Sequence, residues 1–468
     1  MARRQGGTLS GFTPLSTPSA PTIDSVTTSI GSASVAFTAP TDVGDAAVSS
    51  YVVTAVDESS GASTGATGSA SPITVSGIGG QTVKIRMQAL NAYGPGRLTE
   101  YDTGNVIYAG AELYAWGQNF AGNLGDNTTV ARSSPVQIGA LTTWASVSCG
   151  LHTASIKTDG TFWAWGRNNY GQIGDSTTVS RSSPVQVGAL TNWSDVAISQ
   201  AGGTTCSVKS DGTLWSWGDN TYGTLGQNVA STVFRSSPVQ IGASTDWLRV
   251  AAGNSHVAAV KTNGTLWSWG RNNHGQIGDN TIANRSSPIQ VGALSNWYLA
   301  ACGNYHTIVT ATNGALWTFG RNNNGQIGNN TIINRSSAVQ VGALTTWSHV
   351  AGGNSHTEVV KNDGTLWAWG NNSVGELGDT TTVNRSSPIQ IGALTTWSRV
   401  SAGGNNTAAI KTDGTLWTWG WNNNGQLGLN VLSDFNARRS SPTQVGALTN
   451  WSDVSVGQSI ALALYGVV

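Results

Sequence analysis

The sequence predicts an all-β protein in which residues 110–468 form a seven-bladed β-propeller, preceded by an immunoglobulin-like β-sandwich. Glycine makes up 60 of the 468 residues and charged residues only 10%, a composition that suits short strands and tight turns. No apolar period of 3.6 residues persists, which argues against helices. A Trp-Gly or Phe-Gly pair recurs seven times, at intervals of 49 to 52 residues between Trp116 and Trp419.

Each copy of this repeat carries the same motifs in the same order. They are L-W-x-W-G-x-N-x-x-G-x-L/I-G, R-S-S-P-x-Q-V/I-G-A, x-x-W-x-x-V, G-x-x-H-T and K-x-D/N-G. The spacing of two in W-x-W places both tryptophans on one face of a strand, where we expect them to pack in the core against the next blade. The structural tryptophans of the Trp-Gly pairs are Trp116, Trp165, Trp217, Trp269, Trp369 and Trp419.

An Asp-Gly or Asn-Gly pair precedes the L-W-x-W strand in six copies, for example Asp159-Gly160 and Asn263-Gly264. Such a pair between alternating runs predicts a hairpin with a type I′ turn, because that turn needs a positive φ at both central residues. We therefore interpret these aspartates as turn formers and not as catalytic carboxylates.

The two ends of the repeated region complement each other. The region opens on an L-Y-A-W-G strand that lacks its preceding strand, and it closes on S-I-A-L-A-L, which lacks a successor. Pairing residues 459–465 with residues 112–117 completes the seventh blade and closes the ring without open edges. Closure also predicts that the N-terminal segment emerges next to the C-terminus.

Two resemblances to known families follow from these motifs. In W-G-x-N-x-x-G-Q-L/I-G, S-P-x-Q-V and G-x-x-H-T, residues 110–468 resemble the regulator of chromosome condensation repeat family, which implies a seven-bladed propeller. Residues 18–109 resemble a fibronectin type III domain, through Tyr51 and the A-x-N-x-x-G stretch at Ala89, Asn91 and Gly94. Residues 1–17 show no periodicity and are expected to form an arm that is flexible or partner-bound.

Neither a catalytic nor a metal site is expected, and no cofactor is implied. His152, His256, His306 and His356 recur at one repeat position, which is typical of hydrogen-bonded core imidazoles. The three cysteines lie in separate copies, so small buried thiols are expected rather than disulfides. No nucleophile elbow, phosphate loop, metal motif or carboxylate pair appears, and the protein is interpreted as not being an enzyme.

The arginines of R-S-S-P form a ring by symmetry. They are Arg132, Arg181, Arg235, Arg285, Arg335, Arg385 and Arg439. An aspartate lies shortly before the arginine in four copies, so local ion pairs are the favoured interpretation. A ring that binds anions is the alternative.

The loops after each Trp-Gly pair differ between copies, and loops on a rigid scaffold usually carry recognition. The candidate binding-loop residues are Tyr170, Tyr222, Phe234, His274, Trp421 and Phe435. Exposed aromatic side chains at such positions stack on sugar rings or anchor protein contacts. Packing between neighbouring loops is the alternative role.

Charge and hydropathy exclude several classes of partner. The formal net charge is zero, which argues against nucleic acid as a partner, and no apolar run reaches the length of a membrane span. The N-terminus also lacks the apolar core of a signal peptide. Guanine-nucleotide exchange, one role of the resembled repeat family, depends on a protruding insertion and a basic tail, and the near-constant repeat length and zero charge argue against both.

The remaining hypothesis is a phage virion structural protein, part of a tail, fibre, baseplate or capsid decoration, that is made in the host cytoplasm. A fibronectin-like sandwich on a chain with free thiols and a charge-poor, glycine-rich and serine-rich surface favours it. Residues 1–109 then contact other virion proteins, and the propeller loops bind a host-surface glycan or protein. The alternative is an extracellular, secreted bacterial binding or inhibitor protein that uses the same loop face.

Overall fold

The computed structural model describes residues 16–29, 32–57, 63–76, 81–107, 111–431 and 438–466. The chain divides into two compact units, one formed by residues 1–109 with 467–468 and the other by residues 110–466. Apart from one 3₁₀ turn at Thr221–Gly223, every regular element in the described residues is a β-strand. The all-β expectation is therefore confirmed.

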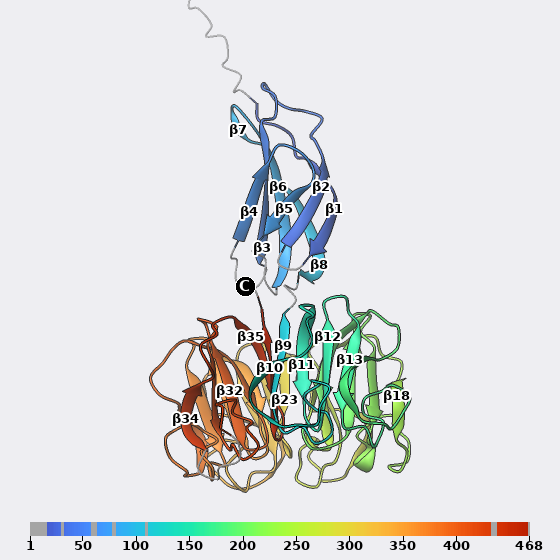
Figure 1. The fold of residues 1–468 in the computed structure, drawn as a ribbon, viewed down its shortest axis with the longest axis vertical. Helices are drawn as coiled ribbons and strands as arrows, with labels where there is room; N and C mark the ends of the chain where they lie inside the picture. Colours follow the sequence, from blue (N-terminus) through green and yellow to red (C-terminus); the bar gives the residue numbers. More distant parts are fainter. Residues whose placement is uncertain are drawn as a thin grey trace, which may run out of the picture. The chain divides into compact units, whose positions relative to one another are not determined.

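The N-terminal unit consists of two antiparallel sheets (Figure 1). One has the strand order β1-β2-β5, and the other has the order β4-β3-β6-β7 with β8 also paired to β6. The strands are β1 (Thr22–Ser29), β2 (Ser32–Thr38), β3 (Ser50–Asp57), β4 (Ser63–Gly68), β5 (Ile73–Ser76), β6 (Gln81–Asn91), β7 (Gly94–Pro95) and β8 (Thr99–Ile107).

Both sheets of this unit contribute to one hydrophobic core. Every second residue of β3 points inward, and Tyr51 contacts Phe37 of the other sheet with ring centroids 4.5 Å apart. Asn91 is buried, and its Nδ2 donates to the carbonyls of Ser16 and Val43 at 3.2 and 3.0 Å. The asparagine of the A-x-N-x-x-G stretch therefore ties two loops to the end of β6.

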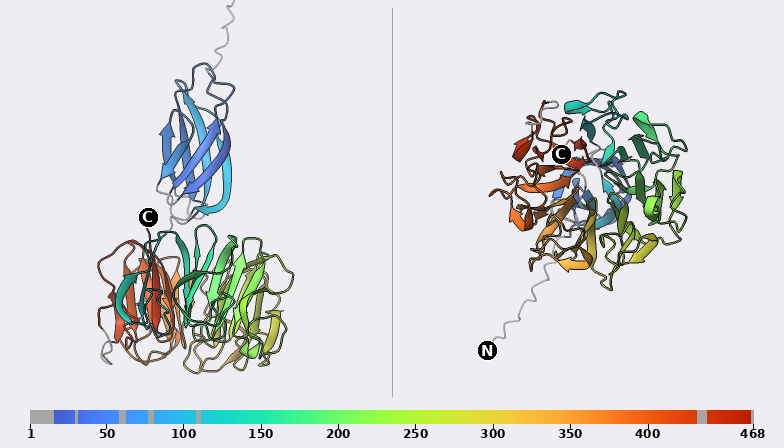
Figure 2. Two further views of the ribbon diagram at one scale, coloured as in Figure 1. Left: turned by 45° about the vertical axis from the view of Figure 1, so that its right-hand side comes forward. Right: turned by 90° about the horizontal axis from the view of Figure 1, so that it is seen from below.

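The second unit contains seven four-stranded antiparallel sheets, which Figure 2 shows arranged as a ring. We number these blades from the first one that is continuous in sequence. Their strands are β11 (Trp144–Cys149), β12 (His152–Lys157), β13 (Phe162–Gly166) and β14 (Arg181–Gln186) in blade 1; β15 (Trp193–Ile198), β16 (Thr204–Lys209), β17 (Leu214–Gly218) and β18 (Arg235–Gln240) in blade 2; β19 (Trp247–Ala252), β20 (His256–Lys261), β21 (Leu266–Gly270) and β22 (Arg285–Gln290) in blade 3; β23 (Trp297–Cys302), β24 (His306–Ala311), β25 (Leu316–Gly320) and β26 (Arg335–Gln340) in blade 4; β27 (Trp347–Gly352), β28 (His356–Lys361), β29 (Leu366–Gly370) and β30 (Arg385–Gln390) in blade 5; β31 (Trp397–Ala402), β32 (Asn406–Lys411), β33 (Leu416–Gly420) and β34 (Arg439–Gln444) in blade 6; and β35 (Trp451–Val456), β36 (Ile460–Tyr465), β9 (Glu112–Gly117) and β10 (Arg132–Gln137) in blade 7.

Blade 7 is assembled from both ends of the repeated region. Strand β36 pairs antiparallel with β9, in a register that joins Ile460 to Gly117 and Tyr465 to Glu112. The indole Nε1 of Trp116 also donates to the carbonyl of Gln426 at 2.9 Å. These contacts join the last copy of the repeat to the first and leave no blade with an unpaired inner strand.

The first strand of each blade, such as β11, lines the axis of the ring, and the R-S-S-P strand lies at the rim. Because the strands alternate in direction, the Trp-Gly loops and the G-x-x-H-T loops emerge on one face, which we call the loop face. The Asp-Gly turns and the G-A-L-T loops emerge on the opposite face, which we call the turn face. The chain enters β9 at Glu112 and leaves β36 at Tyr465, both at the turn face.

The Trp-Gly tryptophans join neighbouring blades. All six are fully buried. Trp217 of blade 2 donates its indole N–H to the carbonyl of Gln172, which belongs to the loop of blade 1, at 2.9 Å. Equivalent bonds connect Trp269 to Thr224 and Trp369 to Gln326 at the same distance. These tryptophans fill the space between two blades, and all of them except Trp165, whose indole N–H has no partner among the described residues, also satisfy a buried carbonyl.

The outer tryptophans of L-W-x-W are less buried than we expected from the shared strand face. Trp163, Trp215 and their equivalents are only partly buried at the rim. The lysine of the K-x-D/N-G motif covers the ring, with Lys157 Nζ 3.7 Å from the centroid of Trp163. The outer tryptophan therefore packs against the hydrophobic core between two blades, as expected, but part of its side chain remains exposed.

The prediction of type I′ turns is wrong. In the turn at Asp159-Gly160 only the glycine has a positive φ, and Gly160 N–H bonds to the carbonyl of Lys157 at 2.9 Å. This is a type I turn followed by a left-handed glycine, a three-residue loop. The Asp159 carboxylate accepts hydrogen bonds from the N–H and the hydroxyl of Thr161, which confirms its role as a turn former.

Candidate binding surfaces of the propeller

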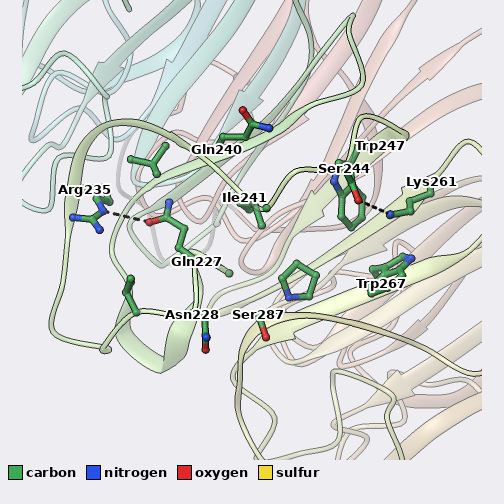
Figure 3. Close-up of a pocket in the computed structure, with 15 residues that line it drawn as sticks. Gln227, Asn228, Arg235, Gln240, Ile241, Ser244, Trp247, Lys261, Trp267 and Ser287 are labelled. Carbon is green, nitrogen blue, oxygen red and sulfur yellow. Dashed lines mark hydrogen bonds between the residues drawn. The ribbon is translucent and has the colours of Figure 1, made fainter.

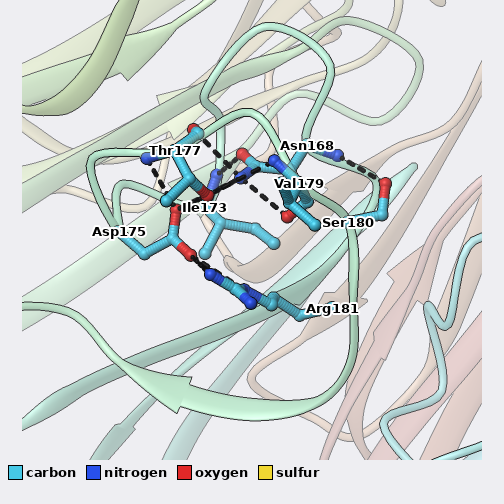
Figure 4. Close-up of polar contacts among 7 residues, drawn as sticks. All are labelled: Asn168, Ile173, Asp175, Thr177, Val179, Ser180 and Arg181. Carbon is cyan, nitrogen blue, oxygen red and sulfur yellow. Dashed lines mark hydrogen bonds and ion pairs between the residues drawn. The ribbon is translucent and has the colours of Figure 1, made fainter.

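One asparagine organises each loop of the loop face, as Figure 4 shows for blade 1. Asn168 is fully buried, its Oδ1 accepts from the N–H of Ile173 at 2.9 Å, and its Nδ2 donates to the carbonyl of Val179 at 3.1 Å. Asp175 in turn pairs with Arg181 at 2.7 Å. The conformation of the loop is therefore fixed by buried polar bonds, and its other side chains are available for binding.

The expected aspartate–arginine pairs are present in four blades and join the loop to the rim strand. Burial alone would raise the pKa of Asp175, but hydrogen bonds from Thr177 and Arg181 outweigh it and lower the pKa. The pairs are Arg132–Asp126, Arg181–Asp175, Arg285–Asp279 and Arg385–Asp379, with shortest nitrogen–oxygen distances of 2.7, 2.7, 2.5 and 2.9 Å.

Two of the candidate binding-loop residues lie together between blades 1 and 2. Tyr170 and Phe234 have ring centroids 5.0 Å apart and are tilted by 53°. Tyr170 also covers Gly203, where an added Cβ would lie 2.9 Å from its ring. Phe234 remains 47% exposed. This contact is loop packing in part, but it leaves an aromatic edge at the surface.

A second cluster extends over blades 2 to 4 and combines aromatic rings with arginines. The guanidinium of Arg271 lies 4.7 Å from the ring centroid of Tyr222 and 5.3 Å from that of Tyr305. Arg321 lies 5.5 Å from the same Tyr305 ring, and His274 packs edge-on against it at 5.6 Å. The cluster therefore combines two cations with three aromatic groups on the loop face, and Arg271 contacts two of the rings.

The arginines of this cluster also affect the nearby imidazole. Burial and the positive charges of Arg321 and Arg271 lower the pKa of His274, which favours the neutral form of the ring. Among the described residues, neither arginine forms an ion pair with a carboxylate. A hydrogen-bond acceptor on a ligand would therefore not have to compete with a carboxylate of the protein for these two arginines.

The sequence interpretation missed Arg271, Tyr305 and Arg321. A signal for the two arginines was present, because the residue after each Trp-Gly or Phe-Gly pair varies among Gln, Arg, Asp, Asn and Trp, whereas Tyr305 lies in the G-x-x-H-T loop. Of the other candidates, Trp421 is partly buried at this variable position on blade 6, and Phe435 lies outside the described residues.

A buried glutamine crosses the axis of the ring, which the sequence did not predict. Gln200 follows β15 of blade 2, and its Nε2 donates to the carbonyls of Gly352 and Ala402 at 2.9 and 2.8 Å. Those carbonyls belong to blades 5 and 6, on the other side of the axis. The side chain therefore crosslinks distant blades at the loop-face end of the channel.

Grooves at the rim separate neighbouring blades, and Figure 3 shows the one between blades 2 and 3, of about 450 Å³. Trp247 and Trp267 lie on one side of this groove and Arg235 on the other. Lys261 pairs with Asp246 at 2.9 Å. Equivalent grooves of about 330 and 620 Å³ lie between blades 1 and 2 and between blades 4 and 5. These rim grooves are partly aromatic and repeat around the ring.

The recurring histidines join adjacent blades within the core. His152 Nε2 lies 2.6 Å from Thr205 Oγ1, and that hydroxyl donates its hydrogen to the carbonyl of Gln172, so the imidazole N–H is the donor. Burial lowers the pKa of His152 to about 3. The other three histidines make the same contact with a threonine of the next blade. They are neutral structural groups.

The remaining titratable core groups also have structural surroundings. All three cysteines are buried and free, and burial raises the pKa of Cys149 and Cys302 to about 12. Glu358 is fully buried in β28, and burial raises its pKa well above the usual value. The described residues contain no group of three or more His, Cys, Asp or Glu side chains placed to hold a metal ion. Within the same ranges no helix has the length and hydrophobicity of a membrane span.

Family models match most of the propeller. The model described as RCC1-like domain matches residues 181–466, more than half of the chain. Two models of the regulator of chromosome condensation (RCC1) repeat match residues 111–154 and 144–172.

Curated relatives are similar over part of the propeller. The E3 ubiquitin-protein ligase HERC2 of Mus musculus is 26% identical over 185 residues, which are 38% of this chain and 4% of that protein. The ultraviolet-B receptor UVR8 of Arabidopsis thaliana is 29% identical over 176 residues, 37% of this chain and 28% of the receptor. The matched region therefore spans only a small part of these relatives.

Solved structures share the fold of the propeller. Human WBSCR16 has a TM-score of 0.68 and 21% identity, covering 76% of this chain and 99% of that one. Prp20p from Saccharomyces cerevisiae has a TM-score of 0.65 and 18% identity, with coverage of 76% and 92%. Together with the repeat motifs and the seven four-stranded blades, these matches confirm the expected repeats, and the chain belongs to the RCC1-like domain family.

Proposed function

We propose that this protein is a non-enzymatic structural component of a phage particle, part of a tail, fibre, baseplate or capsid decoration. In this proposal the N-terminal unit is a fibronectin type III-like sandwich that attaches to other virion proteins. The propeller presents its loop face to the host surface or to a neighbouring subunit.

The observation that carries the proposal is the position of the arginine–aromatic cluster relative to the chain ends of the propeller. Tyr222, Arg271 and Arg321 lie on the loop face, whereas the chain enters and leaves the propeller at Glu112 and Tyr465 on the turn face. A module that connects to the rest of the chain at one face and carries variable side chains on the opposite face is suited to presenting a binding surface. The fixed framework beneath the loops supports this role, because binding sites need rigid supports.

A protein partner is consistent with the family. Prp20p, which shares the propeller fold, is described as binding Gsp1p and histones. We infer that the loop face of the present chain contacts a protein or glycan of its own, recognised through arginine and tyrosine side chains. The alternative is a secreted bacterial binding or inhibitor protein that uses the same face, and the location of the protein separates the two.

Mass spectrometry of phage particles purified from cells that carry the gene tests the proposal. We expect the chain in the particle fraction, at a constant ratio to the major structural proteins after density-gradient purification. A chain found only in particle-free supernatant would support the secreted alternative, and its absence from pure particles would exclude a virion role.

A further inference from the structure

One rim arginine, Arg335, lacks the aspartate partner that four of its six equivalents have. In four blades an aspartate Oδ1 accepts from a threonine of the same loop, and its Oδ2 accepts from the arginine, as in the Asp175–Arg181 pair of blade 1. Blade 4 has Asn329 at the aspartate position and Arg335 at the arginine position. The exchange keeps the shape of the loop and removes its negative charge.

The orientation of the Asn329 amide follows from its neighbours. Its Oδ1 accepts from the N–H and the hydroxyl of Thr331 at 3.2 and 2.7 Å, and from Nδ2 of Asn322 at 3.2 Å. A backbone N–H can only donate, so the oxygen must lie on this side. The Nδ2 group therefore occupies the position from which the aspartates offer Oδ2 to arginine.

Two donor groups thus converge in blade 4 without an acceptor between them. Arg335 Nε is buried and has no hydrogen-bond partner, and the described residues provide no ion pair to this side chain. A buried charged donor without a partner is costly. Blade 2 avoids this conflict, because Gln227 Oε1 accepts from Arg235 Nε at 3.3 Å.

The unpartnered arginine lines the rim groove of about 620 Å³ between blades 4 and 5. Trp347, Trp367 and Pro388 form its apolar wall, and Asn330 and Gln340 contribute amide groups. None of its lining residues is acidic. The groove between blades 1 and 2 is smaller, about 330 Å³, and contains the carboxylate of Asp175.

We propose that this rim groove binds an acidic saccharide, with the carboxylate or sulfate of the sugar accepting hydrogen bonds from Arg335 and from Asn329 Nδ2. Guanidinium groups bind such anions through charge-assisted hydrogen bonds. Lys361 Nζ covers one face of the Trp367 indole at 3.7 Å from the ring centroid, and the part of the indole that lines the groove is left to contact a sugar ring. The neighbouring amides suit the hydroxyl groups of the sugar. The site is separate from the loop-face cluster, so the inference holds whether or not the proposed function is correct.

The binding test uses the full-length protein and isothermal titration with glucuronate, glucose and acetate. We expect glucuronate to bind at least tenfold more tightly than either glucose or acetate, because only glucuronate offers both an anion and a ring. Acetate binding as tightly as glucuronate would contradict the sugar contact with Trp367. Glucose binding equally tightly would contradict the role of the anion, and no heat with glucuronate would overturn the proposal.

Two variants test whether the converging donors, Arg335 and Asn329 Nδ2, bind the anion. Asn329→Asp restores the aspartate of four other blades, so we expect it to fold, to pair with Arg335 and to weaken glucuronate binding at least tenfold. Asn323→Asp adds the same charge at an exposed position of the same loop and should retain wild-type affinity. Equal affinity of Asn329→Asp and wild type would refute the site, as would equal losses in both variants, which would indicate only a general charge effect.

Discussion

The two faces of the propeller are built from the same seven repeats but differ in what they conserve between blades. The turn face repeats its Asp-Gly or Asn-Gly turns in six of the seven copies and presents leucines of G-A-L-T loops that are between 41% and 49% exposed. The loop face places Tyr222, His274 and Trp421 at variable positions above an unchanging layer of buried asparagines. A repeat can vary most where packing does not restrict it, and the variable side chains to which we assign recognition are therefore concentrated on the loop face.

The largest expected effect separates the framework of the loop face from its variable residues. Asn272→Ala removes the acceptor for Ile277 N–H and the donors to Asp279 and the Thr281 carbonyl. We expect a loss of about 3 kcal/mol in unfolding free energy, because buried polar groups lose their partners. His274→Ala, two residues later, should cost less than about 1 kcal/mol. Urea unfolding checks both, and equal costs would contradict the division of the loop into framework and variable residues.

On the turn face, two glycines with the same backbone conformation should respond differently to a methyl group. Gly264 and Gly292 have φ values of 76° and 64°. A Cβ added to Gly264 would lie 2.2 Å from the Ser295 carbonyl oxygen, whereas a Cβ added to Gly292 would meet no atom within 4 Å. We expect Gly264→Ala to cost about 2–3 kcal/mol, the left-handed strain plus a clash, and Gly292→Ala about 1 kcal/mol, the strain alone. Thermal unfolding that ranks them in the opposite order would show that the turn is not rigid.

Glu358 is an exception to the rule that the repeat varies where packing does not restrict it. It differs from the residues at the same position in the other blades, and yet it is buried in a strand. Ile308 occupies the same position in blade 4, so Glu358→Ile should fit and should raise stability at pH 8 by about 2 kcal/mol. Burial raises the pKa of Glu358 in the folded state. The folded protein therefore holds this proton more tightly than the unfolded chain does, and stability falls as the pH rises above the ordinary glutamate pKa of 4.5.

Unfolding free energies of wild type and Glu358→Ile at pH 4, 6 and 8 check this linkage. The difference between the two proteins should increase with pH. A difference that is independent of pH would mean that the Glu358 carboxyl group ionises in the folded protein as it does in the unfolded chain, so that burial does not raise its pKa.

The smallest effect concerns a strained framework position on the loop face. Thr380 has a φ of 67°, in the left-handed region, and its equivalents include Asn280 and Asn330. Thr380→Asn should raise stability by about 1 kcal/mol, because asparagine tolerates this conformation better than a β-branched residue does. Calorimetry on the two proteins measures the shift, and a lower melting temperature in the variant would contradict the strain.

The sequence predicted what one repeat copy determines and missed what depends on several blades. The Trp-Gly spacing indicates seven blades, and the aspartate before the arginine in four copies indicates the ion pairs. By contrast, Gln200 bonds to blades 5 and 6 across the axis, and Tyr305 meets Arg271 of a different blade. Such contacts depend on how neighbouring blades are rotated, which local patterns do not reveal. The type I′ prediction failed because a loop of three residues rather than two separates the strands.

Two further features were visible in the sequence but were not interpreted. Asn329 replaces an aspartate beside Arg335, and Glu358 replaces an apolar residue, and both exchanges can be seen by aligning the seven copies. The cost of each exchange depends on burial, which the repeat alone does not give. The structure shows how deeply each residue is buried, so the cost of both exchanges can be tested by mutation.

The most direct test of the account is binding of the labelled full-length protein to host cells, with one triple variant on each face. The loop-face variant is Tyr222→Ala, Arg271→Ala and Arg321→Ala, and the turn-face variant is Leu190→Ser, Leu294→Ser and Leu394→Ser. Both sets are at least partly exposed, so both variants should fold. We predict at least tenfold weaker binding for the loop-face variant and wild-type binding for the turn-face variant. Loss of binding confined to the turn-face variant would contradict the central claim that the loop face carries recognition.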